Sequence, residues 1–297
     1  MSDDLVRVVN VSRSFGQVRA LDNVSFTVPP GQLIGILGPN GAGKSTLLSL
    51  ITGIRTADSG TVELFSGDPR VPAQRTRLGC TPQQTGLPPN LRVDEVVTFV
   101  GRHYPNPVPG SELLERFGLA SLARRKAGAM SGGQQRRLAV ALAFVGRPDL
   151  VVLDEPTTGM DVEARHQLWD VLRTYRREGG SILLTSHYLE EIEALAERVV
   201  VLSGGRVLDD GGPDAIRGKV ASRRVSFVAY QPPELPGVVS SRVEGERVDL
   251  LCSDSDRVVR ELVGSGTAFS DLTVSDTSLE EAFMALTSPR HRLEGER

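Results

Sequence analysis

A nine-residue stretch near the start of the sequence combines glycine, lysine and hydroxyl residues at a spacing that suits an anion-binding loop. Residues 38–46 read GPNGAGKST. Glycines in such a loop allow backbone N–H groups to turn toward phosphate oxygens, and a helix that starts nearby adds the positive end of its dipole. The pattern predicts that Lys44 reaches the β- and γ-phosphates of a nucleotide and that the Ser45 hydroxyl ligates Mg²⁺. The expected phosphate-binding residues are Gly38, Pro39, Asn40, Gly41, Ala42, Gly43, Lys44, Ser45 and Thr46.

Two adjacent carboxylates follow an apolar run farther along the chain. Residues 150–156 read LVVLDEP, which places Asp154 and Glu155 where a buried strand is expected to end. Carboxylates at such a place are costly without partners, and alternation along a strand points the two side chains in different directions. We expect Asp154 to hold Mg²⁺ and Glu155 to act as the general base that polarises the attacking water. The alternative is a pair of solvated carboxylates in a loop.

A histidine closes the next apolar run. Residues 182–187 read ILLTSH, so His187 leaves the end of another predicted strand. A lone histidine at a strand end is usually a structural residue. If this strand lies in a parallel sheet beside the phosphate loop, however, His187 becomes a candidate sensor of the γ-phosphate.

A second glycine-rich helix start lies at residues 130–137, MSGGQQRR. Ser131 and Gln134 have the S-x-x-Q spacing of a capping box. The segment of Ser131, Gly132 and Gly133 would therefore present free N–H groups and a hydroxyl, which makes it a possible second anion site. The other interpretation is a helix that is merely well capped, and the segment alone does not decide between them.

The elements that must position these residues follow from the hydrophobic pattern. Residues 5–28 alternate like two antiparallel strands, whereas the runs at 32–38, 149–155 and 181–187 are nearly continuous and indicate strands buried on both faces. Helical patterns cover 44–53, 131–145 and 162–178. Such alternation predicts a parallel sheet in an α/β core, with ligands at the carboxyl ends of the strands.

The pattern changes after residue 198. A hairpin with a Gly204-Gly205 turn comes first, and 215–222 is expected to be a linker. Strand-like and helical stretches from 223 onward then indicate a small α/β appendage. Ser278 and Glu281 have capping-box spacing for its last helix.

Composition excludes several classes of protein. The chain has 297 residues, of which 39% are hydrophobic, with a formal net charge of −3 and two cysteines. These values give no electrostatic case for nucleic-acid binding and no disulfide framework. No apolar run reaches the roughly 18 residues of a membrane-spanning helix, and the acidic start lacks the features of a signal peptide. If the chain works at a membrane, another protein must bring it there.

The order of the motifs carries a resemblance to a known family. A phosphate loop, a PQQ glutamine at 83, the Ser-Gly-Gly-Gln segment, LVVLDEP and then a histidine resemble the nucleotide-binding domain of ATP-binding cassette (ABC) ATPases over roughly residues 5–215. The resemblance implies that Ser131, Gly132, Gly133 and Gln134 cap the γ-phosphate bound by a second, antiparallel domain. Because this chain has one of each motif, it implies a pair of chains, either two copies or this chain and a paralogue, that sandwich two ATP molecules.

The resemblance also assigns roles to three further positions. Phe15 matches an aromatic residue that stacks on adenine, although a core residue of an antiparallel strand is the alternative. Gln83 matches the glutamine that contacts Mg²⁺ and water and follows the transmembrane partner, with Gln84 as the neighbouring choice. Asp161 matches the segment that couples the two sites across the dimer.

The fold class implied is α/β: a P-loop NTPase core with a parallel sheet, an antiparallel β subdomain, a helical subdomain at about 85–148 and a C-terminal α/β appendage. The expected domains are 1–215, the nucleotide-binding domain, and 216–297, an accessory region.

The function implied is that of the ATP-hydrolysing subunit of a membrane ABC transporter. It would bind ATP and Mg²⁺ and sit peripherally on the cytoplasmic face of the membrane through separate multi-span permease subunits, with no nucleic-acid partner. The segment SLEEAFMALT (278–287) looks like the ending of ATPases from bacterial drug-resistance exporters of the daunorubicin type, which favours export over import. The alternative is a soluble ABC ATPase acting on ribosomes or nucleic acid, but one cassette without a heptad run argues against it.

Overall fold

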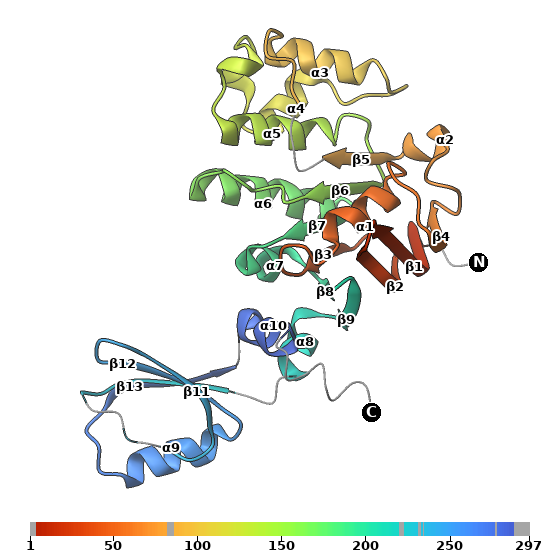
Figure 1. The fold of residues 1–297 in the computed structure, drawn as a ribbon. Coiled ribbons are helices and arrows are strands. Elements are labelled where there is room, and N and C mark those ends of the chain that lie inside the picture. Colours follow the sequence, from red (N-terminus) through yellow and green to blue (C-terminus); the bar gives the residue numbers. More distant parts are fainter. Residues whose placement is uncertain are drawn as a thin grey trace. The chain divides into compact units, whose positions relative to one another are not determined.

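The computed structural model describes residues 4–81, 86–219, 223–230, 233, 235–276 and 278–287. Within it the chain divides into two compact units, 1–212 and 213–297. The first unit contains all the predicted nucleotide motifs, and the second contains the C-terminal strands and helices (Figure 1).

A six-stranded sheet forms the centre of the first unit. Its strand order is β5-β6-β7-β3-β8-β9, and every neighbouring pair is parallel except β8 and β9. All residues of β3, β6 and β7 are buried, which confirms the three strands predicted from continuous apolar runs. The strands are β3 (Leu33–Leu37), β5 (Leu78–Thr81), β6 (Leu150–Asp154), β7 (Ser181–Ser186), β8 (Arg198–Ser203) and β9 (Arg206–Gly211).

A separate antiparallel sheet has the order β2-β1-β4. Strands β1 (Val6–Phe15) and β2 (Val18–Val28) confirm the predicted pair, and Gly16 takes the positive φ of 59° that their tight turn requires. Strand β4 (Ser59–Leu64) escaped prediction because its exposed, polar sequence SGTVEL shows no alternation.

Helix α1 packs between the two sheets. It contacts β2 and β4 on one side and β6 on the other, and Leu47, Leu50 and Ile51 are buried in the shared core. Farther along the chain, α3, α4 and α5 group beyond the β5 edge of the six-stranded sheet (Figure 1). The helices of this unit are α1 (Lys44–Ile51), α2 (Pro72–Arg75), α3 (Val93–Gly101), α4 (Gly110–Arg116), α5 (Gly132–Leu142), α6 (Val162–Arg177) and α7 (Leu189–Leu195).

The second unit is built on a four-stranded antiparallel sheet of order β11-β12-β10-β13. Helix α9 covers one face, where Val258 and Leu262 pack among Val225, Phe227 and Val248. The predicted capping box of the last helix is present, because Ser278 and Glu281 exchange backbone-to-side-chain hydrogen bonds. The elements are α8 (Pro213–Lys219), β10 (Arg223–Val228), β11 (Val238–Glu244), β12 (Arg247–Cys252), α9 (Ser255–Gly264), β13 (Ser270–Asp276) and α10 (Leu279–Thr287).

The prediction of a linker at 215–222 was wrong for its first part. Residues 213–219 form α8, and Ile216 on this helix is fully buried. Proline at the first helical position favours a helix start, and a single buried apolar residue is too weak a pattern to reveal a short helix. Among the described residues, no helix is both long and apolar enough to cross a membrane.

Candidate nucleotide site

The glycine-rich loop lies between β3 and α1, at the carboxyl edge of the parallel sheet. Its lysine is 6% exposed, and Lys44 Nζ donates to the carbonyl oxygens of Gly38 at 2.6 Å and Pro39 at 3.1 Å. Burial lowers the pKa of Lys44, and this effect is partly opposed by the charges of Glu155 and Asp154. The lysine therefore lies inside the loop and within the electrostatic reach of both acidic residues.

Two glycines of this loop need the conformational freedom that only glycine has. Gly41 has φ of 80° and Gly43, which precedes the first residue of α1, has φ of 103°. A Cβ on Gly43 would lie 2.4 Å from the carbonyl oxygen of Ala20, whereas a Cβ on Gly41 would meet open space. Strain therefore fixes glycine at both positions, and at Gly41 the open side leaves room for a ligand.

The acidic pair lies on β6, directly beside β7. In the sheet register Asp154 pairs with Thr185. The Thr185 hydroxyl donates to Asp154 Oδ1 at 2.6 Å and accepts from the backbone N–H of Glu155 at 3.0 Å. Asp154 is 7% exposed. The Asp154 carboxylate and the backbone N–H of Glu155 therefore have a buried protein partner. This argues against the alternative of two solvated carboxylates in a loop.

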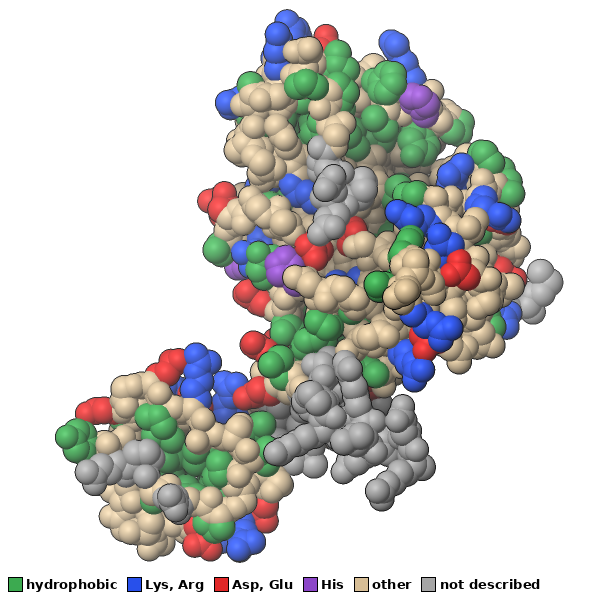
Figure 2. Space-filling model, in the orientation of Figure 1, with side chains coloured by type: hydrophobic (Ala, Val, Ile, Leu, Met, Phe, Trp, Pro, Cys, Tyr) green, Lys and Arg blue, Asp and Glu red, His purple; other side chains and the backbone are tan. Residues whose placement is uncertain are grey.

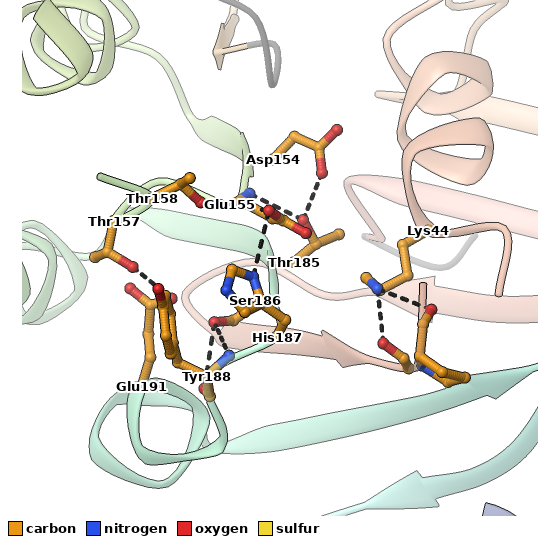
Figure 3. Close-up of polar contacts among 12 residues, drawn as sticks. Lys44, Asp154, Glu155, Thr157, Thr158, Thr185, Ser186, His187, Tyr188 and Glu191 are labelled. Atoms are coloured by element: carbon orange, nitrogen blue, oxygen red, sulfur yellow. Dashed lines mark hydrogen bonds and ion pairs between the residues drawn. The ribbon is translucent and has the colours of Figure 1, made fainter. Parts of the chain in front are cut away.

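The backbone of Glu155 adopts a left-handed conformation. Its φ is 49°, a conformation that costs a residue with a side chain about 1–3 kcal/mol and persists only where the surroundings hold it. Glu155 Oε2 accepts from the Thr158 hydroxyl at 3.3 Å and lies 3.3 Å from Nδ1 of His187. The structure thus brings together Glu155 and His187, which lie 32 positions apart in the sequence (Figure 3).

The Ser-Gly-Gly segment starts α5 as the capping box predicts. The backbone N–H of Gln134 donates to Ser131 Oγ at 3.3 Å, and the backbone N–H of Ser131 donates to Gln134 Oε1 at 3.1 Å. Ser131 and Gly132 are exposed, and a Cβ on Gly133 would lie 2.8 Å from the carbonyl oxygen of Gly159. The turn therefore offers a surface on one side and packs against the segment after Glu155 on the other.

Two other predicted residues lie elsewhere on the same unit. Phe15 ends β1 and is 39% exposed, so it is not a core residue. The guanidinium carbons of Arg13 and Arg55 each lie 5.0 Å from its ring centre. Figure 2 shows that Lys and Arg side chains also gather in places on the face of the molecule that it presents. Asp161 caps α6 through a 2.7 Å hydrogen bond from the backbone N–H of Ala164. Gln83 and Gln84 lie outside the described residues.

Sequence reasoning missed three residues that structure this site. Thr185 joins Asp154 to Glu155, and Arg136 of α5 donates to their backbone carbonyls. Glu191 of α7 is fully buried and accepts from Thr157 and Trp169. No distinctive spacing marks any of these three residues in the sequence. They are a threonine in a strand, one of two consecutive arginines and a glutamate in a charged helix, so only burial identifies them.

Together these features define a class of protein. A phosphate loop leading from a buried strand into a helix, with an acidic pair at the end of a strand of the same sheet, is the arrangement of a P-loop nucleoside triphosphatase. The additional antiparallel sheet and the helical group around α5 match the ATP-binding cassette expected from the motif order.

Comparisons with known proteins agree with this class. The family model described as ABC transporter matches residues 21–158. A Nod factor export ATP-binding protein I from Sinorhizobium fredii (strain NBRC 101917 / NGR234) is 37% identical, over 96% of this chain and 87% of its own. The daunorubicin resistance ATP-binding protein DrrA3 from Streptomyces coeruleorubidus is 32% identical, over 99% of both chains.

Solved structures show the same fold for most of the chain. A structure titled as the ATP-binding subunit of an ABC transporter aligns with a TM-score of 0.66 and 27% identity, over 72% of this chain and 92% of that one. An ATP-binding cassette described as dimeric, in a post-hydrolysis state bound to ADP and Pi, aligns with a TM-score of 0.64 and 25% identity, over 70% and 98%.

The chain belongs to the ABC transporter family, as an ATP-binding subunit. It binds ATP and hydrolyses it to power transport. ATPases of this family dimerise and pair with membrane permease subunits.

Proposed function

We propose that this chain energises an ABC exporter whose substrate path lies in separate multi-span permease subunits. The observation that carries the proposal is the cluster of Asp154, Glu155 and His187 at the carboxyl edge of the sheet that also ends in the phosphate loop. ATP would close a dimer of nucleotide-binding subunits and hydrolysis would reopen it. The γ-phosphate would therefore shift the equilibrium between the open and the closed dimer toward the closed state.

The roles of the site residues follow from their geometry. The loop of residues 38–46 would cradle the phosphates, with Lys44 at the β- and γ-phosphates. Glu155 would take the proton of the attacking water as general base, and His187, 3.3 Å from it, would contact the γ-phosphate. Phe15, exposed beside two arginines, would stack on the adenine.

The oxygen donors at the site suit Mg²⁺, which keeps several waters and needs few protein ligands. Oδ1 of Asp154 accepts from Thr185, and among the described residues Oδ2 has no hydrogen bond, so it is available to the hydrated ion. The exposed hydroxyl of Ser45 at the start of α1 is a second donor. Gln83 completes the proposed set. Bound Mg²⁺ would neutralise phosphate charge.

A second subunit would complete each ATP site. Ser131, Gly132, Gly133 and Gln134 would face the γ-phosphate held by the partner, and Asp161 would couple the two sites. The exposed Ser131 and Gly132 at a capped helix start support this, as does the dimer named for the related cassette. The partner is a second copy of this chain or a paralogue.

The direction of transport comes from the relatives. Proteins named for Nod factor export and for daunorubicin resistance align over nearly the full chain.

We assign residues 1–215 to the nucleotide-binding domain, with a helical subdomain at about 85–148, and residues 216–297 to an accessory region. The chain would be held peripherally at the cytoplasmic face of the membrane by the permease, without a nucleic-acid partner.

A pull-down tests this proposal. Tagged Glu155→Gln protein, extracted from its native membranes in mild detergent with ATP, should bring a multi-span membrane protein in about equal amount, because a closed dimer is trapped on the permease. The matched control is the same preparation without ATP. Recovery of ribosomal proteins or nucleic acid with no membrane partner would contradict the transporter role.

A further inference from the structure

Helix α5 carries two consecutive arginines with different surroundings. Arg136 is 5% exposed, whereas Arg137 is partly exposed and donates to Gln167 of α6 at 3.0 Å. A guanidinium loses its hydration when it is buried, and that loss must be compensated by hydrogen bonds or by opposite charge. The contacts of Arg136 therefore show what this position contributes.

Arg136 contacts the backbone at the end of β6. Its Nη2 atom donates to the carbonyl oxygen of Asp154 and, at 3.0 Å, to that of Glu155. The preceding turn of the same helix packs closely against the same segment. Gly133 approaches it so closely that a Cβ on this residue would lie 2.8 Å from the carbonyl oxygen of Gly159. Residues three apart share one helix face, so one face of α5 packs along residues 154–159.

The charge of Arg136 fits this place. Burial lowers the pKa of the guanidinium, while Asp154, Glu155 and Glu191 oppose that shift. An arginine remains protonated at neutral pH in such surroundings. The permanent positive charge of Arg136 therefore lies within electrostatic reach of the Asp154 and Glu155 carboxylates. Its guanidinium also donates hydrogen bonds to the main-chain carbonyls of these two residues.

The backbone that Arg136 contacts is the strained one. Glu155 has φ of 49°, a conformation that persists in a non-glycine residue only where neighbours hold it. On one side its N–H donates to the hydroxyl and the carbonyl oxygen of Thr185, at 3.0 and 3.2 Å. On the other side its carbonyl oxygen accepts from Arg136. Rotation of this residue would move Oε2 away from Nδ1 of His187.

We propose that Arg136 is a positioning residue for ATP hydrolysis, which holds Glu155 in the left-handed conformation that aims its carboxylate at the attacking water. This rests on the proposed role of Glu155 as general base. Arg136 acts through Glu155. It also belongs to the helix that starts at the Ser131 turn, so the turn proposed to meet the partner's ATP and the group that holds this chain's own base share one rigid element.

Steady-state kinetics of substituted full-length protein test the proposal. Arg136→Gln should lower kcat about 10- to 100-fold, as expected for a misplaced catalytic group, and leave KM for ATP within about twofold. Arg136→Lys should fall between, because it keeps the charge but loses the planar fork. Arg137→Gln is the matched control and should resemble the wild type. Equal kcat values for Arg136→Gln and Arg137→Gln would overturn the proposal.

A double-mutant cycle separates positioning from other roles. In single-turnover hydrolysis, Arg136→Gln should have little further effect once Glu155→Gln has removed the carboxylate. The same fold loss in both backgrounds would overturn the proposal, because Arg136 would then act independently of Glu155. If Glu155→Gln itself hydrolyses ATP at the wild-type rate, the general-base assignment fails instead. Melting temperatures establish folding, and where Arg136→Gln is unfolded, Arg136→Lys is judged by the same criteria.

Discussion

The hydroxyl of Thr185 donates a 2.6 Å hydrogen bond to Oδ1 of Asp154, and the two residues are register partners on β7 and β6. The same hydroxyl accepts from the backbone N–H of Glu155. A single buried hydroxyl therefore connects the proposed metal ligand to the proposed base.

Replacing this hydroxyl by a methyl group should impair both the Mg²⁺ binding proposed for Asp154 and the general-base role proposed for Glu155. Thr185→Val keeps the shape but leaves Asp154 Oδ1 without its donor, which should lower the free energy of unfolding by about 1–3 kcal/mol. We expect kcat to fall and the Mg²⁺ concentration for half-maximal activity to rise. Thr185→Ser keeps the hydroxyl and serves as the control. Unchanged Mg²⁺ dependence in Thr185→Val would contradict the link to the metal ligand.

Removing the charge of Glu155 should stop turnover without preventing binding. Glu155→Gln keeps the size of the side chain but cannot accept a proton from water, so kcat should fall about 10²- to 10⁴-fold while ATP affinity is retained. Glu163→Gln, an exposed acidic residue in the first turn of α6, is the control. Phosphate release at the wild-type rate from Glu155→Gln would remove it as the base.

Disrupting the Ser-Gly-Gly turn should affect assembly and not nucleotide binding. Ser131→Arg places a bulky cation at the exposed start of α5, far in sequence from the phosphate loop. In the Glu155→Gln background, which should trap the closed dimer, size-exclusion chromatography with ATP should then show only monomers. A normal ATP-dependent dimer would show that the turn does not meet the partner's nucleotide.

The buried carboxyl of Glu191 should make stability depend on pH. Burial raises its pKa above the ordinary 4.5, despite the hydrogen bonds from Trp169 and Thr157 and the nearby charge of Arg165. Arg136 is also within its electrostatic reach. Between the ordinary and the raised pKa the folded state binds more protons than the unfolded state, so stability falls as pH rises through that window.

Glu191→Gln tests this dependence because glutamine does not titrate. The melting temperature of the variant relative to the wild type should increase as the pH rises from below 4.5 to neutrality. Trp169 is the single tryptophan of the chain and contacts Glu191 directly, so its fluorescence reports unfolding. A melting-temperature difference that is constant with pH would contradict the raised pKa.

Much of the site could be predicted because parallel strands end at the same edge of a sheet. The runs before Gly38, Asp154 and His187 are continuous and apolar, so their buried strands could be predicted from the sequence, and with them the meeting of these residues. The register between β6 and β7 could not be predicted, because a continuous apolar run gives no signal for which residues of the two strands pair. The two hydrogen bonds of the Thr185 hydroxyl therefore had to come from the structure.

Other misses have different causes. Strand β11 carries mostly exposed residues at the edge of its sheet, so its sequence VVSSRVE has little apolar alternation. Arg136 and Arg137 are chemically identical neighbours, and only the packing of α5 on residues 154–159 buries one of them. The positive φ of Glu155 is likewise a property of the packed turn, because glutamate has no preference for that conformation.

Sharing of each ATP site between two chains is the central claim, and mixing two inactive variants tests it most directly. Lys44→Ala removes the phosphate-loop cation, and Ser131→Arg blocks the turn that faces the partner, so neither should hydrolyse ATP alone. A mixed dimer of the two contains one intact site, formed by the phosphate loop of the Ser131→Arg chain and the turn of the Lys44→Ala chain. We predict that mixing restores ATP hydrolysis well above the activity of either variant. A mixture no more active than its separate components would contradict sites shared between two copies of this chain.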